Sequence, residues 1–201
     1  MLRLKKWGWA IRIAGYTVIL DACVLYPAPL RDFLLELAAS GIFRARWSDM
    51  IHDEWIRNLS ENRPDLDATR LARTRQLMNE SVLGALVEGF EDLIPSMNLP
   101  DDDDRHVLAA AVHAGADAIV TANLKDFPTA VAKQYELEIL HPDEFLYQQF
   151  GLDQAAVVIA ARNCRMRLRN PPKTADEYLA ILEAQSLPLL VGELRAFRDL
   201  I

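Results

Sequence analysis

The chain has 201 residues, of which 51% are hydrophobic and 25% charged, and its formal net charge is −7. These values are typical of an ordinary globular protein, long enough for one well-buried domain and an appendage. No run of about 18 apolar residues occurs, so we expect no transmembrane helix. The acidic balance argues against a passive nucleic-acid binder, which usually carries a basic excess. It does not exclude an enzyme that acts on phosphates through bound cations, because cations locally invert the sign of an acidic cluster.

The first 15 residues are basic and apolar, but a charge interrupts the apolar stretch and a strand follows directly, so we expect no signal peptide. We expect residues 1–15 to form a peripheral extension, with Trp7 and Trp9 either packed on the body or exposed. Cys23 and Cys164 lie far apart and predict no disulfide framework, which is typical of a reduced cytoplasmic protein. The sequence contains neither Cys-x-x-Cys spacing for zinc nor a glycine-rich phosphate loop.

Between residues 16 and 150, short apolar runs alternate with amphipathic segments. This alternation predicts an α/β fold, with a mostly parallel sheet covered by helices on both faces. The predicted strands are 17–21, 86–87, 118–121 and 138–140, and the predicted helices are 29–40, 49–62, 66–79, 104–114 and 142–149.

The segment 151–201 differs, because its pattern is helical only. We expect one helix over 153–169, a second that opens at the capping-box sequence 174–177, and a third over 187–197. The segment is therefore predicted to be an all-helical C-terminal extension with little core of its own.

Polar side chains follow two of the predicted strands. Asp21 ends the first strand, and Thr121, Asn123 and Asp126 follow the strand at 118–121. Open α/β sheets bind their ligands beyond the carboxyl ends of strands, and clustered oxygen ligands suit Mg²⁺ or Mn²⁺. Asp21 taken alone is equally well explained as the cap of a helix or turn.

Two predicted helices bring further carboxylates. Glu54 flanks the buried stripe of the helix 49–62, where an inward carboxylate is costly unless it is paired or bound to a cation. An isolated Glu at that boundary is otherwise a solvated residue. In the run of four aspartates we expect Asp104 to point toward the core edge and Asp103 to cap the helix.

Four motifs carry a resemblance to a known family. They are Leu-Asp-Ala-x-Val-Leu at 20–25, the helical Glu54, Asp-Arg-His-Val-Leu-Ala-Ala-Ala at 104–111, and Ala-Asp-Ala-Ile-Val-Thr-x-Asn-x-x-Asp-Phe at 116–127. With these motifs the chain resembles PIN-domain proteins, in particular the VapC-like ribonuclease toxins of bacterial toxin–antitoxin pairs. The resemblance covers roughly residues 16–150, and its last two blocks are specific at this spacing. It implies a PIN-like three-layer α/β/α nuclease domain over 16–150.

The resemblance also implies a catalytic metal site. Its acidic positions carry over to Asp21, Glu54 and Asp104, with Asn123 or Asp126 as the fourth. Many members of the family have Asp where this chain has the neutral Asn123, which leaves open whether Asp126 compensates and whether one metal or two bind. Thr121 is implied to steady the cluster through hydrogen bonds rather than to bind metal.

The leading hypothesis is a metal-dependent endoribonuclease, in which Mg²⁺ or Mn²⁺ activates a water and neutralises the leaving oxygen. The resemblance implies an RNA substrate, a small antitoxin with a DNA-binding domain as partner, and a homodimer without membrane association. The alternative is a PIN-like RNA- or protein-interaction module with a weak or inactive metal site, but three clear carboxylates favour catalysis. A phosphatase or dehalogenase ranks lower, because it would want Asp-x-Asp where this chain has Asp21-Ala-Cys23.

Two groups of basic residues are candidates for contact with RNA or a partner, since arginine binds phosphate through a planar fork. Charge runs on amphipathic helices are nevertheless commonly solvated faces. His106 and His113 do not share a helix face with Asp104, so we expect both at the helix surface. The candidate contacts are Arg57 in the hairpin 49–79 and Arg165, Arg167 and Arg169 in the extension.

Overall fold

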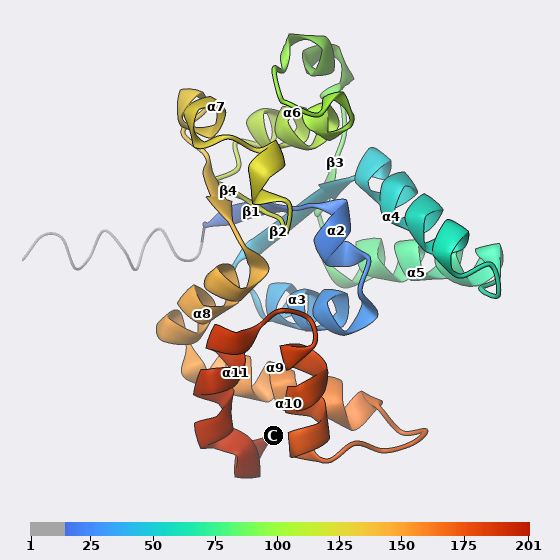
Figure 1. The fold of residues 1–201 in the computed structure, drawn as a ribbon, viewed down its shortest axis with the longest axis vertical. Coiled ribbons are helices and arrows are strands. Elements are labelled where there is room, and N and C mark those ends of the chain that lie inside the picture. The colour runs from blue at the N-terminus through green and yellow to red at the C-terminus, as the bar shows by residue number, and fades with distance from the viewer. Residues whose placement is uncertain (1–14) are drawn as a thin grey trace, which may run out of the picture.

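A five-stranded parallel sheet forms the centre of the protein (Figure 1). The structure is a computed structural model, and it describes residues 15–201. The predicted N-terminal extension, with both of its tryptophans, lies outside the described residues except for Gly15. The sheet has the order β3-β2-β1-β4-β5. Its strands are β1 Thr17–Leu20, β2 Arg44–Ser48, β3 Leu86–Val87, β4 Ala118–Val120 and β5 Glu138–Leu140.

The strand order reverses direction at β1. The chain runs from β1 through β2 to β3 on one side, and β4 and β5 are then added on the other side. Leu20 pairs with Val120, so β1 and β4 end at the same level of the sheet. Ligands of open α/β sheets bind where the strand order reverses, beyond the carboxyl ends of the strands. The fold therefore directs attention to the residues that follow β1 and β4.

Helices cover both faces of the sheet and complete a three-layer α/β/α arrangement. Figure 1 shows α6 and α7 on one face and α3 and α8 on the other, with the α4–α5 hairpin beyond β2 and β3. α6 lies close to the strands because Ala109, Ala110 and Ala111 are buried and small. The helices before β5, with η marking the 3₁₀ helices, are α2 Ala22–Leu25, α3 Ala28–Ser40, α4 Asp49–Asn62, α5 Ala68–Ser81, η1 Glu91–Ser96, η2 Asp102–Asp104, α6 Arg105–His113, η3 Leu124–Asp126 and α7 Thr129–Gln134.

The C-terminal segment is helical, as predicted, and it packs on the helical layer formed by α3 and α8. α9 contacts α3 and α11 contacts α8. The buried Asp143 in α8 accepts hydrogen bonds from the backbone N–H groups of Leu189 and Leu190 at 2.9 and 3.0 Å, which fixes the start of α11. The apolar side chains of this segment join the same continuous core as the sheet. Its elements are α8 Pro142–Leu152, α9 Gln154–Arg167, α10 Ala175–Glu183, α11 Pro188–Leu194 and η4 Arg195–Leu200.

Among the strands and α-helices of the described residues, β2, α2 and α7 were not predicted from the sequence. β2 has the sequence Arg-Ala-Arg-Trp-Ser, whose alternation places Ala45 and Trp47 in the core and its arginines outward. α2 is a single turn and α7 has six residues, so neither shows a clear helical period. Over residues 15–201, no helix combines the length and the apolar character needed to cross a membrane.

Candidate metal centre

Asp21 lies directly after β1, with only 2% of its surface exposed. Its carboxylate accepts the backbone N–H of Ala22 at 2.6 Å and the hydroxyl of Thr121 at 2.6 Å. Burial raises the pKa of Asp21, although these donors act in the opposite direction. The aspartate therefore caps α2 and at the same time places a buried carboxylate between the ends of β1 and β4.

Thr121 and Cys23 hold this carboxylate from two elements. The Thr121 hydroxyl, which donates to Asp21, accepts the backbone N–H of Asn123 at 2.9 Å. The Cys23 thiol donates to Asp21 Oδ2 at 3.1 Å, and its sulfur accepts the N–H of Ala122 at 3.2 Å. Burial, with the charge of Asp21, raises the pKa of Cys23 to about 12, so the side chain remains a thiol donor at neutral pH. Asp21 is thus oriented by a network that joins α2 to the loop after β4.

Glu54 comes from α4, which starts beyond the end of β2. The Ser48 hydroxyl caps this helix by accepting the N–H of Ile51 at 3.2 Å. Glu54 follows in the second turn and is half-buried, with its Oε2 at 3.2 Å from Nε2 of His106 in α6. The carboxylate therefore points across to α6 rather than into solvent.

Asp104 is the last residue of η2 and the residue before α6. It is half-buried, whereas Asp103 is exposed. The expectation that Asp103 caps the helix is wrong, because Asp101 caps η2 by accepting the N–H of Asp103 at 3.0 Å and no side chain caps α6. The extra 3₁₀ turn shifts the cap two residues toward the N-terminus.

The electrostatics place Asp104 among several other carboxylates. Burial raises its pKa to about 7, and the negative charges of Asp21, Asp126, Asp101 and Glu54 contribute in that order. We refer to Asp21, Glu54, Asp104 and Asp126 as the acidic cluster. Its members come from the residue after β1 and from α4, η2 and η3, so the fold gathers them from four separate parts of the sequence.

Asn123 and Asp126 lie on the same loop but in different surroundings. Asn123 is exposed, and its backbone oxygen accepts the N–H of Asp126 at 3.0 Å. Asp126 is half-buried, and its charge acts on Asp104. Lys125 Nζ lies 4.0 Å from Asp126 Oδ1 but is largely exposed. The carboxylate of Asp126 is therefore electrostatically coupled to Asp104.

The acidic cluster has the chemistry of a site for a hard divalent cation. Among residues 15–201, no three Asp, Glu, His or Cys side chains are drawn together closely enough to enclose an ion in this conformation. The mutual repulsion that raises the pKa of Asp104 is nevertheless the kind of strain that a bound cation relieves. Carboxylate oxygens are the ligands that Mg²⁺ and Mn²⁺ prefer. The residues present therefore fit such an ion.

Comparison with known proteins gives the family. Residues 17–125 match the PIN domain family. The chain belongs to the PIN-domain family. Residues 142–196 also match the family described as the VapC50 C-terminal domain. A relative from Mycobacterium tuberculosis, named "Putative ribonuclease VapC50", is 42% identical over 101 residues, which are 50% of this chain. The chain spans 59% of the length of that relative. No solved structure matches the chain.

Two residues of this PIN domain were missed or misplaced by the sequence reasoning. Cys23 was assigned no role, although it stands two residues after Asp21 in the first motif. His106 was expected at the helix surface, but only 8% of it is exposed and it contacts Glu54. Its position beside Asp104, in one of the two specific motifs, was the signal that could have singled it out.

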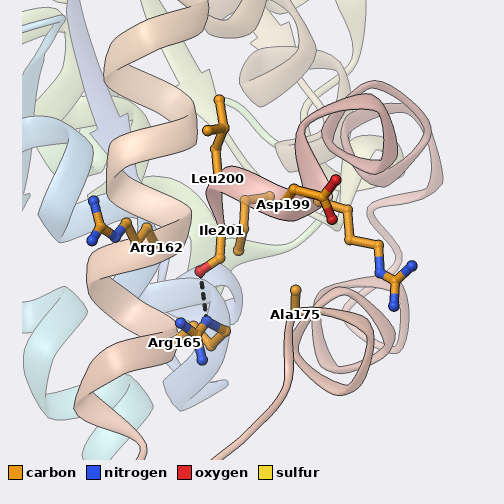
Figure 2. Close-up of a pocket in the computed structure, with 7 residues that line it drawn as sticks. Arg162, Arg165, Ala175, Asp199, Leu200 and Ile201 are labelled. Atoms are coloured by element: carbon orange, nitrogen blue, oxygen red, sulfur yellow. Dashed lines mark hydrogen bonds between the residues drawn. The ribbon is translucent and has the colours of Figure 1, made fainter.

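Two arginines of the C-terminal extension have partners within the protein. Arg165 donates from Nε to the backbone oxygen of Ile201 at 2.6 Å (Figure 2). Its Nη1 donates to the backbone oxygen of Lys173 at 2.7 Å. Arg167 pairs with Glu36 of α3. These contacts attach the extension to itself and to the PIN domain. Arg169 and, on α4, Arg57 are exposed.

Proposed function

We propose that the protein is a metal-dependent endoribonuclease, the toxin of a toxin–antitoxin pair. The observation that supports this proposal most directly is the acidic cluster beyond the carboxyl ends of β1 and β4 of a PIN domain. The name of the 42% identical relative, a ribonuclease, points to the same activity. Packing alone does not explain a buried, hydrogen-bonded aspartate surrounded by further carboxylates, because a neutral residue would fill the same space at a lower cost.

In this proposal the acidic cluster holds one or two Mg²⁺ or Mn²⁺ ions. A bound cation would supply a water of lowered pKa and neutralise the charge that develops on the leaving oxygen. Thr121 and Cys23 keep the Asp21 carboxylate oriented through their hydrogen bonds. Arg57 lies on the exposed side of α4, one turn after Glu54, where its guanidinium can meet a phosphate of the RNA.

The partners proposed for this site are RNA and a small antitoxin with a DNA-binding domain. We further propose that the protein works in the cytoplasm, where the unpaired Cys23 and Cys164 remain reduced. We also propose the domain limits 16–150 for the nuclease and 151–201 for the extension. The two matched families fall at 17–125 and 142–196.

We propose a homodimer that uses the outer face of α9. Ile159 and Met166 lie seven residues apart on α9 and are 56% and 53% exposed. A seven-residue spacing of apolar side chains is typical of the contact face between two paired helices. In an antiparallel pair, Asp153 at the start of one α9 lies toward Arg162 near the end of the other. Replacing Ile159 by Lys should shift the protein to the monomer in size-exclusion chromatography.

Cleavage of RNA tests the proposed activity. The purified protein should cut RNA in Mn²⁺ and lose the activity in EDTA. Asp21→Asn should lower the rate by at least about a hundredfold, because the amide keeps the shape but loses the charge. Asp103→Asn, in an exposed aspartate, is the matched control and should retain activity. Binding of RNA without cleavage in any divalent metal would instead favour the interaction module.

A further inference from the structure

His106 connects two elements of the acidic cluster. It lies in the first turn of α6, two residues after Asp104, and its Nε2 is 3.2 Å from Oε2 of Glu54 in α4. The two residues are 52 positions apart in the sequence. An ionised carboxylate only accepts hydrogen bonds, so Nε2 is the nitrogen that carries the hydrogen and donates it.

The other ring nitrogen of His106 is buried without a partner. Nδ1 has no hydrogen-bond partner among residues 15–201, and the side chain is 9% exposed. A buried polar atom left unpaired costs stability, and most such atoms in native proteins are satisfied. A leucine of similar size would fill the same space between α6 and α4 without that cost. Packing alone therefore does not account for a histidine here.

The contact with Glu54 does account for it. Glu54 lies at the border of the core, and its long side chain has enough rotamers to turn into solvent. A donor on the neighbouring helix selects the rotamer that points toward Asp104 and Asp21, whose pKa values respond to the charge of Glu54. Proteins tolerate the loss of stability caused by a partly unsatisfied polar group mainly at functional sites.

We propose that His106 is a positioning residue that holds Glu54 in place as a metal ligand. This inference rests on the proposed metal-dependent function. Partners that orient metal ligands typically change metal affinity by about ten- to a hundredfold when they are removed. His106 thereby acts through Glu54, and it needs no contact with the metal or the RNA.

Titration calorimetry of Mn²⁺ into the metal-free full chain tests the proposal without relying on activity. His106→Leu should lower the affinity for Mn²⁺ by about tenfold, because Glu54 loses its donor. His106→Gln, whose side-chain amide can donate from a similar distance, should recover most of it. The exposed His113 at the other end of α6 provides the matched control, and His113→Leu should bind Mn²⁺ like the wild type.

The thermal stability of the same variants in EDTA separates positioning from folding. His106→Leu should melt no lower than the wild type, because the unpaired Nδ1 is removed. If it fails to fold, His106→Asn replaces it, since the shorter amide does not reach Glu54. Mn²⁺ affinity unchanged in these variants would overturn the role of His106 alone. Absence of Mn²⁺ binding by the wild type would overturn the metal site and this role together.

Discussion

Replacing Asp104 by Asn should stabilise the metal-free protein at pH 8. The pKa of Asp104 is raised from 3.8 to about 7, chiefly by burial and then by the charge of Asp21. Ionising this carboxyl in the folded protein is therefore unfavourable. The difference between 3.8 and about 7 corresponds to about 4 kcal/mol as an upper bound. Asp104 is only half-buried, so solvent screening reduces the gain to about 1–2 kcal/mol.

The dependence on pH identifies the cause. The folded state keeps its proton up to about pH 7, whereas the unfolded chain releases it near 3.8, so this group lowers stability progressively as the pH rises between those values. The gain from Asp104→Asn should accordingly appear at pH 8 and vanish at pH 4. For a chain of this size, 1–2 kcal/mol raises the melting temperature by about 3–6 °C.

Thermal unfolding in EDTA, followed by circular dichroism at both pH values, measures the effect. Asp103→Asn is the control, since it lies one residue away and is exposed. Adding Mn²⁺ should reverse the ranking at pH 8, because the wild type gains a ligand that the variant binds weakly. An equal gain at pH 4 and pH 8 would refute the electrostatic argument, as would no gain at either.

Three further predictions concern the rest of the fold. Asp143→Ala removes the acceptor for two N–H groups of α11, one of them buried, and should lower the free energy of unfolding in urea by about 2–4 kcal/mol; a loss under about 0.5 kcal/mol would contradict this role. Burial lowers the pKa of His52, so the wild type should lose stability as the pH falls below about 6.5; His52→Gln should not show this loss in urea titrations at pH 7 and pH 5. Arg57→Ala should flatten the salt dependence of RNA affinity, whereas Arg165→Ala should leave that slope unchanged; the opposite result would reverse the roles given to these arginines.

Much of the fold was predictable because its elements carry strong local signals. The helix over 49–62 and the strands at 86–87 and 138–140 have the predicted bounds, and Thr174 forms the predicted capping box with Glu177. β2 was not predictable in the same way. Its two arginines make the segment look polar. The alternation of buried and outward side chains becomes clear only from the pairing of β2 with β1 and β3.

The site was predictable at the level of residue types but not of contacts. The positions of Asp21, Glu54, Asp104 and Asp126 follow from strand ends and motifs, whereas their mutual arrangement depends on how four elements pack. His106 shows the limit most clearly. Because His106 does not share a helix face with Asp104, the sequence predicts it at the surface. However, α6 is covered by η1 and α4 as well as by the sheet, so a second side of this helix is also buried. Local sequence does not encode that additional layer.

The spread of the acidic cluster along the chain has a consequence for synthesis. Asp21 and Asp126 are separated by more than half of the sequence, and β4 must pair with β1 before Thr121 reaches Asp21. Such non-local pairings form late, because the loop between them must close first. A chain still emerging from the ribosome therefore has no assembled centre until Asp126 has been made and β4 has paired with β1. The topology itself delays any activity of this centre until the PIN domain is nearly complete.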